Sequence, residues 1–344
     1  MTSPKNILIV RTDRIGDVVL SLPLASIIKQ NIPGSHVAFL LREYTKALAE
    51  NNTFIDSAFV LNESSGKIPI WKNVAMLKNK FDACIVAFPT FKIALILFLS
   101  GIRTRVGTGY RWYSFLFNKK IYEHRKHGDF HELEYNVHLL KQININLVPD
   151  KSSVQFGLNI NSADQNKIKS KLEKLEVDLS KPIIIFHPGS GGSAVDLPVE
   201  KLRMLIKKVS SEINCVVIIT GSRNEEELCR SLIVNSNVIN TAGKFEMNEL
   251  IALINCSQIL VANSTGPIHI AAALGKFVVG FYPKFAAVSP KRWGPYTEKA
   301  AIFQPEICDG YCSREKCKEL DCMNSINIEN VFSVIKEKIS KTGK

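Results

Sequence analysis

Two carboxylates and two arginines occupy the first loop of this sequence that is suited to chemistry. The loop RTDRIGD, residues 11–17, follows the apolar run NILIV and places Asp17 at the expected start of a helix. A carboxylate at such a position can take a proton from a substrate hydroxyl. An aspartate there can equally serve as a helix N-cap, and the local sequence leaves both roles open.

The second such loop, HPGSGGSA at residues 187–194, follows the apolar run PIIIF. Its backbone N–H groups around Gly191, with the hydroxyls of Ser190 and Ser193, are suited to holding phosphate. The loop formally matches the GxGxxA pattern of dinucleotide sites, but the next strand ends in TGS, residues 220–222, where a nicotinamide site would want an acid. A phosphate site is therefore favoured over a dehydrogenase.

A third loop, NSTGPIHIAAALG at residues 263–275, again joins a strand to a helix. Ser264, Thr265 and Gly266 put hydroxyls and free N–H groups at the helix start, where the helix dipole favours a diphosphate. His269, one turn further on, is read as a core histidine ahead of a ligand-binding role.

Glu225 lies in a fourth loop, GSRNEEE at residues 221–227. Its carboxylate could accept hydrogen bonds from the hydroxyls of a ribose. Acidic residues are also common at solvated helix starts, so the structural role is about as well supported.

Two further patterns are weak indications of a metal-binding site. HELEY at residues 131–135 begins like a zinc-protease helix, but Tyr135 stands where the second histidine should be. Four cysteines fall within fifteen residues without the paired Cx2C spacing of zinc ribbons: Cys308, Cys312, Cys317 and Cys322. Reduced thiols that shape a loop are favoured over zinc.

Uniformly apolar segments that end at Gly, Ser or Pro indicate strands buried on both faces of parallel sheets. The predicted strands are 6–10, 36–41, 81–88, 182–188, 214–220, 258–263 and 276–283. The predicted helices between them are 18–30, 44–50, 131–142, 198–211, 224–234 and 246–256. This alternation predicts an α/β fold.

The alternation occurs twice, so we expect two Rossmann-like domains with parallel sheets facing across a cleft. The expected division is a first Rossmann-like domain over 1–160, a linker helix over 161–181, a second Rossmann-like domain over 182–325 and a C-terminal helix over 326–344. In open parallel sheets ligands bind beyond the carboxyl ends of the strands, where all four loops would lie.

Composition and charge exclude several classes of protein. The 344 residues are 46% hydrophobic and 22% charged, which excludes a disordered chain or a disulfide-rich mini-protein. The longest apolar stretch, IALILFLS at 93–100, is too short to span a bilayer, and no signal peptide is evident, so a cytoplasmic location is expected. The net charge of +12 is concentrated in the first half, which favours an anionic partner: nucleic acid, an anionic membrane surface, or a phosphorylated or carboxylated substrate. On charge alone, a solvated basic face is equally compatible.

Together these loops resemble the ADP-heptose:lipopolysaccharide heptosyltransferases of glycosyltransferase family 9. The matching segments run nearly end to end: 7–23, 101–111, 131–140, 187–192, the Gly-Ser loop with Glu225, 242–254, 263–283 and the cysteine segment closing on Cys322-Met323. The resemblance implies a GT-B fold and inverting transfer of heptose from ADP-heptose to the inner core of lipopolysaccharide. It implies no cofactor and no nucleic-acid partner, and it assigns the acceptor to the domain over 1–160 and the nucleotide sugar to the domain over 182–325. The lack of an Asp-x-Asp pair on a plausible loop predicts a metal-independent reaction.

The resemblance also implies roles for individual residues. Asp17 is expected as the general base. Donor contacts are expected at Ser190, Gly191, Glu225, Lys244, Phe245, Ser264, Thr265, Gly266 and His269, with Lys244 and Phe245 at the adenine rim. The anionic acceptor is assigned to Arg14, Arg105 and Arg111, and the 93–100 stretch to peripheral contact with the inner membrane.

The sequence departs from the family pattern at two positions. Val195 stands where relatives often carry Lys or Arg, so a cation that would offset the diphosphate is missing, and position 195 is expected to point toward the phosphates. Ser264 stands where others have Asp. Arg14, Lys244 or Lys284 are candidates for the missing charge.

Two rival functions remain open from the sequence. A nucleotide-sugar epimerase of the same fold would convert its donor without an acceptor. A non-catalytic sugar-binding or lipopolysaccharide-binding relative is favoured only by Val195.

Overall fold

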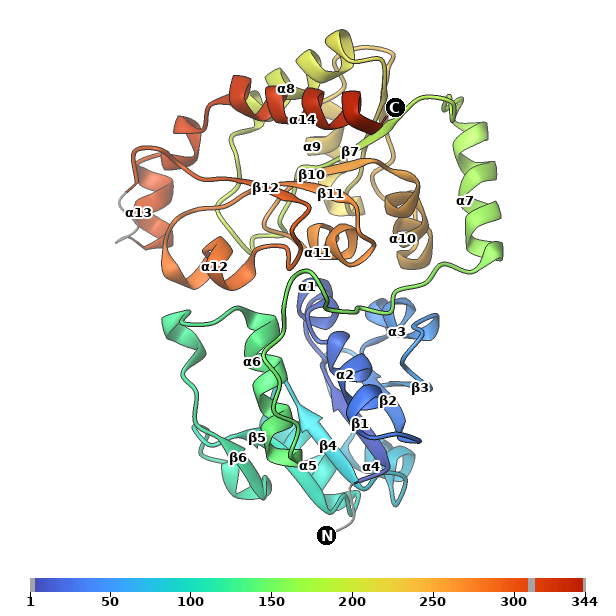
Figure 1. The fold of residues 1–344 in the computed structure, drawn as a ribbon, viewed down its shortest axis with the longest axis vertical. Coiled ribbons are helices and arrows are strands. Elements are labelled where there is room, and N and C mark those ends of the chain that lie inside the picture. The colour runs from blue at the N-terminus through green and yellow to red at the C-terminus, as the bar shows by residue number, and fades with distance from the viewer. Residues whose placement is uncertain (1–3, 309–312, 343–344) are drawn as a thin grey trace. The chain divides into compact units, whose positions relative to one another are not determined.

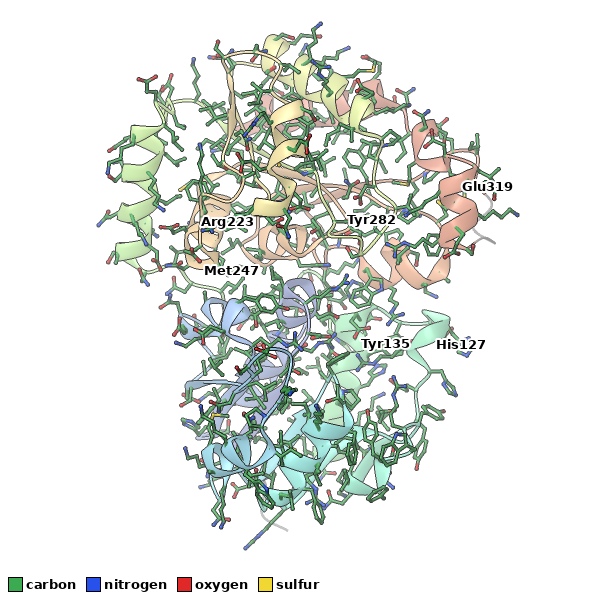
Figure 2. All side chains as sticks on the ribbon, turned by 180° about the vertical axis from the view of Figure 1, so that it is seen from behind. His127, Tyr135, Arg223, Met247, Tyr282 and Glu319 are labelled. Atoms are coloured by element: carbon green, nitrogen blue, oxygen red, sulfur yellow. The ribbon has the colours of Figure 1, made fainter. Side chains whose placement is uncertain are left out.

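The computed structural model describes residues 4–308 and 313–342, which form two compact units (Figure 1). The first unit comprises Met1–Lys126 and Phe130–Asn159, and the second comprises His127–Asp129 and Ile160–Lys344. Each unit has its own sheet and its own hydrophobic core.

The described strands of the first unit form a six-stranded, wholly parallel sheet in the order β3-β2-β1-β4-β5-β6. The strands are β1 (Asn6–Val10), β2 (His36–Leu41), β3 (Ser57–Val60), β4 (Ala83–Val86), β5 (Thr104–Thr108) and β6 (Lys119–Ile121). The central strand β1 is buried from Ile7 to Val10, as expected for a strand covered on both faces.

The helices of the first unit are mostly short. They are α1 (Ile15–Val19), α2 (Pro23–Asn31), α3 (Ala47–Glu50), α4 (Ile70–Leu77), α5 (Phe91–Leu99) and α6 (Glu132–His138). The single helix predicted over 18–30 is wrong in detail, because the chain is interrupted between Leu20 and Leu22 and a new helix starts at Pro23. Proline is compatible with a first helical turn but not with a helix interior, which explains the break.

The second unit repeats this design with the order β12-β11-β10-β7-β8-β9, also parallel throughout among the strands described. Its strands are β7 (Ile183–His187), β8 (Val216–Ile219), β9 (Val238–Asn240), β10 (Ile259–Asn263), β11 (Phe277–Phe281) and β12 (Ala300–Phe303). The two central strands, β10 and β7, lead directly into the two loops predicted to bind phosphate.

The helices of the second unit are α7 (Ser162–Lys174), α8 (Val199–Glu212), α9 (Glu226–Ser231), α10 (Met247–Cys256), α11 (Gly266–Ala273), α12 (Pro290–Trp293), α13 (Arg314–Glu319) and α14 (Ile328–Thr342). Helix α14 lies alongside α8, and α7 lies alongside α10 (Figure 1). The α/β class with two parallel sheets is thus confirmed.

No helix in the described part of the chain is both long and apolar enough to cross a bilayer. Helix α5 contains most of the apolar 93–100 stretch, but it has only nine residues. A bilayer-spanning helix needs about 20.

Candidate functional site

Arg11 is the centre of a buried charge cluster that follows β1. Its side chain is 2% exposed, and its guanidinium donates from Nε to Asp13 Oδ1 at 2.7 Å and from Nη1 to Glu132 Oε1 at 3.3 Å and Asn136 Oδ1 at 3.2 Å. It also pairs through Nη2 with Asp17. One cation therefore orients three carboxylates from two segments, RTDRIGD and α6.

The predicted base, Asp17, is the third residue of α1 and does not cap it. The N-cap is Arg14, whose side chain makes no capping hydrogen bond within the described structure. The alternative role of Asp17 as an N-cap is therefore wrong, and its carboxylate is held instead by Arg11.

Burial dominates the acidity of this cluster. It raises the pKa of Asp17 although the Arg11 guanidinium acts in the opposite direction. It likewise raises the pKa of Asp13 to about 6, against the attraction of Arg11. A carboxylate whose pKa is raised toward the working pH is a stronger base while still ionised, which suits proton abstraction.

Arg11, Asp13 and Glu132 were not among the residues singled out from the sequence. The sequence did contain a signal for Arg11 and Asp13, because both charged residues directly follow the buried strand β1. Glu132 gave no such signal, since it lies more than a hundred residues away and is brought in by α6.

The three arginines assigned to the acceptor have different surroundings. Arg14 and Arg111 are exposed. Arg105 is half-buried in β5, where its Nε donates to the Leu116 carbonyl at 2.8 Å and its Nη1 to the Ile102 carbonyl at 2.5 Å. Arg105 thus connects β5 to its neighbouring loops. Acceptor binding by Arg14, Arg105 and Arg111 stays a prediction.

In the second unit, the glycine-rich loop after β7 is held against the β10–α11 loop. Ser193 Oγ donates to the carbonyls of Ser190 at 2.7 Å and Ser264 at 2.8 Å. Asn263 Nδ2 donates to the Pro188 carbonyl at 2.6 Å, and its Oδ1 accepts from the Leu197 amide at 2.9 Å. The two loops predicted to hold phosphate therefore lie side by side.

The backbone of the glycine-rich loop requires glycine at two positions. Gly191 and Gly192 have φ values of +55° and +74°, a conformation that other residues rarely adopt. An added Cβ at either position would meet no atom within 4 Å. The loop thus leaves open space above its backbone, which suits the close approach of a ligand.

Helix α11 begins at this place. Thr265 is its N-cap, with no capping hydrogen bond from its side chain within the described structure, followed by Gly266 and Pro267 in the first turn. The first N–H groups of a helix lack intrahelical partners and attract anions. His269 is 4% exposed, and Ser264 is 9% exposed, so both are largely buried.

Glu225 lies against the glycine-rich loop. Its Oε2 accepts from the Ser222 amide at 2.8 Å and the Ser222 hydroxyl at 2.7 Å. Burial raises its pKa, but the Ser222 hydrogen bonds and His187 outweigh burial and hold the pKa below its ordinary value. A Cβ added at Gly189 would lie 1.7 Å from Glu225 Oε1, so glycine is needed there for the carboxylate to approach.

His187, at the end of β7, is a further buried polar residue that the sequence reasoning did not select. Its Nδ1 lies 2.9 Å from Thr220 Oγ1. Burial lowers its pKa to about 4, so the ring is neutral at physiological pH. It also interacts electrostatically with Glu225.

Lys244 and Phe245 follow β9, where the adenine rim was predicted. Lys244 is exposed, and Phe245 is half-buried. The Lys171 ammonium of α7 lies 5.6 Å from the centroid of the Phe245 ring. One face of this ring is therefore engaged by α7.

Val195 does not point toward the phosphate loop. It is 8% exposed and belongs to the hydrophobic core of the second unit, with Ile184, Phe186 and Leu197. The expectation that position 195 faces the diphosphate is therefore wrong, because the apolar side chain turns inward to the core.

The described part of the cysteine segment brings three thiols together. The thiol of Cys322 makes hydrogen bonds with those of Cys308 and Cys317, and burial raises its pKa. Cys312 lies outside the described residues. Within the described ranges, no group of three or more His, Cys, Asp or Glu side chains is arranged to hold a metal ion.

Comparison with known proteins defines the class. The structure of Escherichia coli ADP-heptose lps heptosyltransferase II matches with a TM-score of 0.80 and 19% identity over 98% of this chain and 100% of that chain. Escherichia coli heptosyltransferase WaaC with ADP matches with a TM-score of 0.72 and 18% identity over 97% of this chain and 99% of that chain. The fold is that of a GT-B glycosyltransferase with two α/β units.

The sequence then specifies the family. Residues 70–323 match glycosyltransferase family 9 (heptosyltransferase). Lipopolysaccharide heptosyltransferase 1 of Campylobacter coli is 24% identical over 350 residues, 96% of this chain and 98% of the relative. The chain belongs to glycosyltransferase family 9, and it is an enzyme of the heptosyltransferase type.

Proposed function

We propose that this enzyme transfers heptose from ADP-heptose to the inner core of lipopolysaccharide, with inversion at the anomeric carbon and without a metal ion. The observation that carries the proposal is Asp17, a largely buried carboxylate held by Arg11 beyond the carboxyl end of β1, in a member of the heptosyltransferase family. WaaC, a relative in fold, has been solved with ADP, which supports an ADP-linked donor.

In the proposed reaction, Asp17 accepts the proton of an acceptor hydroxyl as its oxygen attacks the anomeric carbon. The bond from that carbon to the ADP oxygen breaks, and ADP leaves with the bonding electrons. The N–H groups of the glycine-rich loop and of the α11 start stabilise the charge that develops on the diphosphate. Glu225 is assigned to the ribose, and the backbone near Lys244 and Phe245 to the adenine.

Positive charge and exposed aromatic residues in the first unit support binding of an anionic, membrane-embedded acceptor. Lipopolysaccharide cores are anionic, and the first half of the chain carries most of the net positive charge. Phe91 and Phe98 lie two turns apart on α5 and are 38% and 47% exposed. The Phe91 ring stacks on that of Trp112, with centroids 4.8 Å apart and Trp112 73% exposed.

Exposed aromatic groups beside the exposed cations Lys92 and Arg111 favour the interface of an anionic bilayer. We therefore assign this aromatic strip (Phe91, Phe98 and Trp112) to peripheral contact with the cytoplasmic face of the inner membrane.

Transfer of heptose by the purified enzyme tests the proposal. ADP-heptose is mixed with lipopolysaccharide lacking the accepting heptose, with and without EDTA, and the anomeric configuration of the product is read by NMR. Product of inverted configuration, formed equally with EDTA, is expected. Conversion of the donor without acceptor would show an epimerase instead, and loss of activity in EDTA restored by magnesium would refute the metal-independent route.

Replacement of the base gives the sharper test. Asp17→Asn should lower kcat by about 100-fold or more while leaving the Kd for ADP nearly unchanged, as expected for loss of a general base. The matched control is Asp13→Asn, because Asp13 shares the Arg11 partner and the same 14% side-chain exposure. A larger loss of turnover in Asp13→Asn would assign the base to Asp13.

A further inference from the structure

The glycine-rich loop lies next to a cation that does not come from its own segment. Arg314 is the first residue of α13, in the cysteine segment about 120 residues further along the chain. Its Nη2 donates to the Ala194 carbonyl at 2.9 Å and also to the Gly192 carbonyl. The guanidinium therefore lies directly against the loop predicted to bind phosphate.

Part of the guanidinium is not used by the described structure. Arg314 Nε is buried and has no hydrogen-bond partner among residues 4–308 and 313–342. A guanidinium carries five N–H donors, and the contacts with the loop carbonyls go through a single nitrogen. Burial raises the pKa of Asp196, and hydrogen bonds with Ser190 and the charge of Arg314 partly offset that rise.

Helix α13 is anchored, so Arg314 is not a loosely attached surface arginine. Cys317 on the same helix is 1% exposed and lies in the core of the second unit together with Cys308 and Cys322. The Ser313 hydroxyl caps the helix by accepting from the Lys316 amide at 3.3 Å. The cysteine segment thus positions a cation.

We propose that Arg314 supplies the positive charge that neutralises the diphosphate of the nucleotide-sugar donor and of the departing nucleotide, in place of the side chain at position 195. This inference rests on the proposed function for the presence of a nucleoside diphosphate. Val195 is turned into the core, while Arg314 donates hydrogen bonds to carbonyls of the same loop. Charge-assisted hydrogen bonds from a guanidinium are stronger than neutral ones and suit phosphate oxygens.

Calorimetric titration of ADP and of adenosine separates this role from a purely structural one. Arg314→Gln should weaken ADP binding about 5- to 30-fold at low salt, with the difference shrinking as salt rises, and should leave adenosine binding unchanged. Arg314→Lys keeps the charge and should retain most of the affinity for ADP. Lys318→Gln removes one charge from the same helix at an exposed position and should have no effect.

Three results would overturn the inference. Equal ADP affinity in Arg314→Gln and wild type would show that the charge is not used. Equal weakening of ADP and adenosine, or an Arg314→Lys variant as weak as Arg314→Gln, would show that Arg314 only holds the loop in shape.

The same titrations with UDP and GDP separate failure of this inference from failure of the proposed donor. Binding of UDP or GDP, but not ADP, that is weakened in Arg314→Gln would support the role of Arg314 and refute the ADP-linked donor. Absence of binding by all three nucleotides would refute both.

Discussion

At the scale of single residues, one buried arginine orients the candidate base and the carboxylates around it. Arg11 contacts Asp13, Asp17 and Glu132, and Glu132 also pairs with Arg125. Buried ions are tolerated only when they are paired, so the largely buried Asp13 and Asp17 depend on Arg11. The orientation of Asp17 is therefore a property of the cluster.

Replacement of Arg11 tests this dependence. Arg11→Met should lower the free energy of unfolding by about 3–5 kcal/mol at pH 7.5, because buried carboxylates lose their partner. The loss should be smaller at pH 5, where the unpaired carboxyls take up protons. Denaturant titration at both pH values measures it, with Arg103→Met as a control for loss of an exposed charge. An equal loss at both pH values would indicate that packing, and not charge, is responsible.

The lowered pKa of His187 predicts that the stability of the second unit depends on pH. Its folded pKa is about 4, below the ordinary value of 6.5. Above pH 6.5 the imidazole is neutral in both states, whereas between pH 6.5 and 4 the unfolded chain binds a proton that the folded chain does not. Stability should therefore fall as the pH is lowered through this window, by up to about 3 kcal/mol.

His187→Gln removes this titrating group and should flatten the pH dependence of the unfolding free energy between pH 6.5 and 4. His36→Gln, which replaces an exposed histidine of the first unit, is the control. If both variants kept the wild-type slope, the pH dependence would have to come from other groups.

At the scale of elements, the central strands were predictable and the edge strands were not. β1, β2, β4, β7, β8, β10 and β11 lie within the apolar runs identified from the sequence. β3, β5, β6, β9 and β12 were missed; they include the outermost strands of both sheets. An edge strand has a neighbour on one side only, so its sequence is less uniformly apolar: all four residues of β3 are only half-buried.

The linker helix predicted from its lysine and glutamate content is docked by a specific ion pair. Lys167 and Lys171 of α7 reach Glu249 Oε1 of α10 at 2.9 and 2.7 Å, and Glu249 is 1% exposed. Burial raises the pKa of Glu249, but the hydrogen bonds from Lys171, Lys167 and the Glu246 amide outweigh it and lower the pKa to about 2. α7 also carries Lys171 to the Phe245 ring, so this docking shapes the predicted adenine rim.

Glu249→Gln should therefore destabilise the second unit by about 1–2 kcal/mol at pH 7, a value reduced because both lysines are partly exposed to solvent. The contribution is present above the unfolded pKa of 4.5 and is lost as the pH falls toward 2, so the difference from wild type should shrink below pH 4.5. Chemical unfolding from pH 7 to 3.5 measures it, with Lys169→Gln as the exposed control on α7. A difference that does not change with pH would argue against the ion pair.

At the scale of the whole molecule, the excess of positive charge in the first half of the chain predicts that this half binds anionic surfaces. The enzyme should bind vesicles of phosphatidylethanolamine and phosphatidylglycerol more tightly than vesicles of phosphatidylcholine, and less tightly as salt rises. Trp112→Ser should weaken binding about 10-fold, because it removes the most exposed side chain of the aromatic strip. Met204→Ser, at a 62% exposed position on α8, should not. Equal effects of both substitutions in a vesicle sedimentation assay would refute docking through the strip.

Local sequence was sufficient for the α/β alternation, the strand-to-helix loops and the candidate residues within them, because burial periodicity and turn composition are short-range properties. The partners of those residues depend on tertiary structure. Glu132 approaches Arg11, and Arg314 approaches Ala194, across more than a hundred residues. The inward turn of Val195 likewise follows from packing against β7 and its neighbours, which no pattern within the SAVDLP segment specifies. Long-range contacts of this kind form only when the sheets assemble, and they decide which charges surround the candidate base and the phosphate loop.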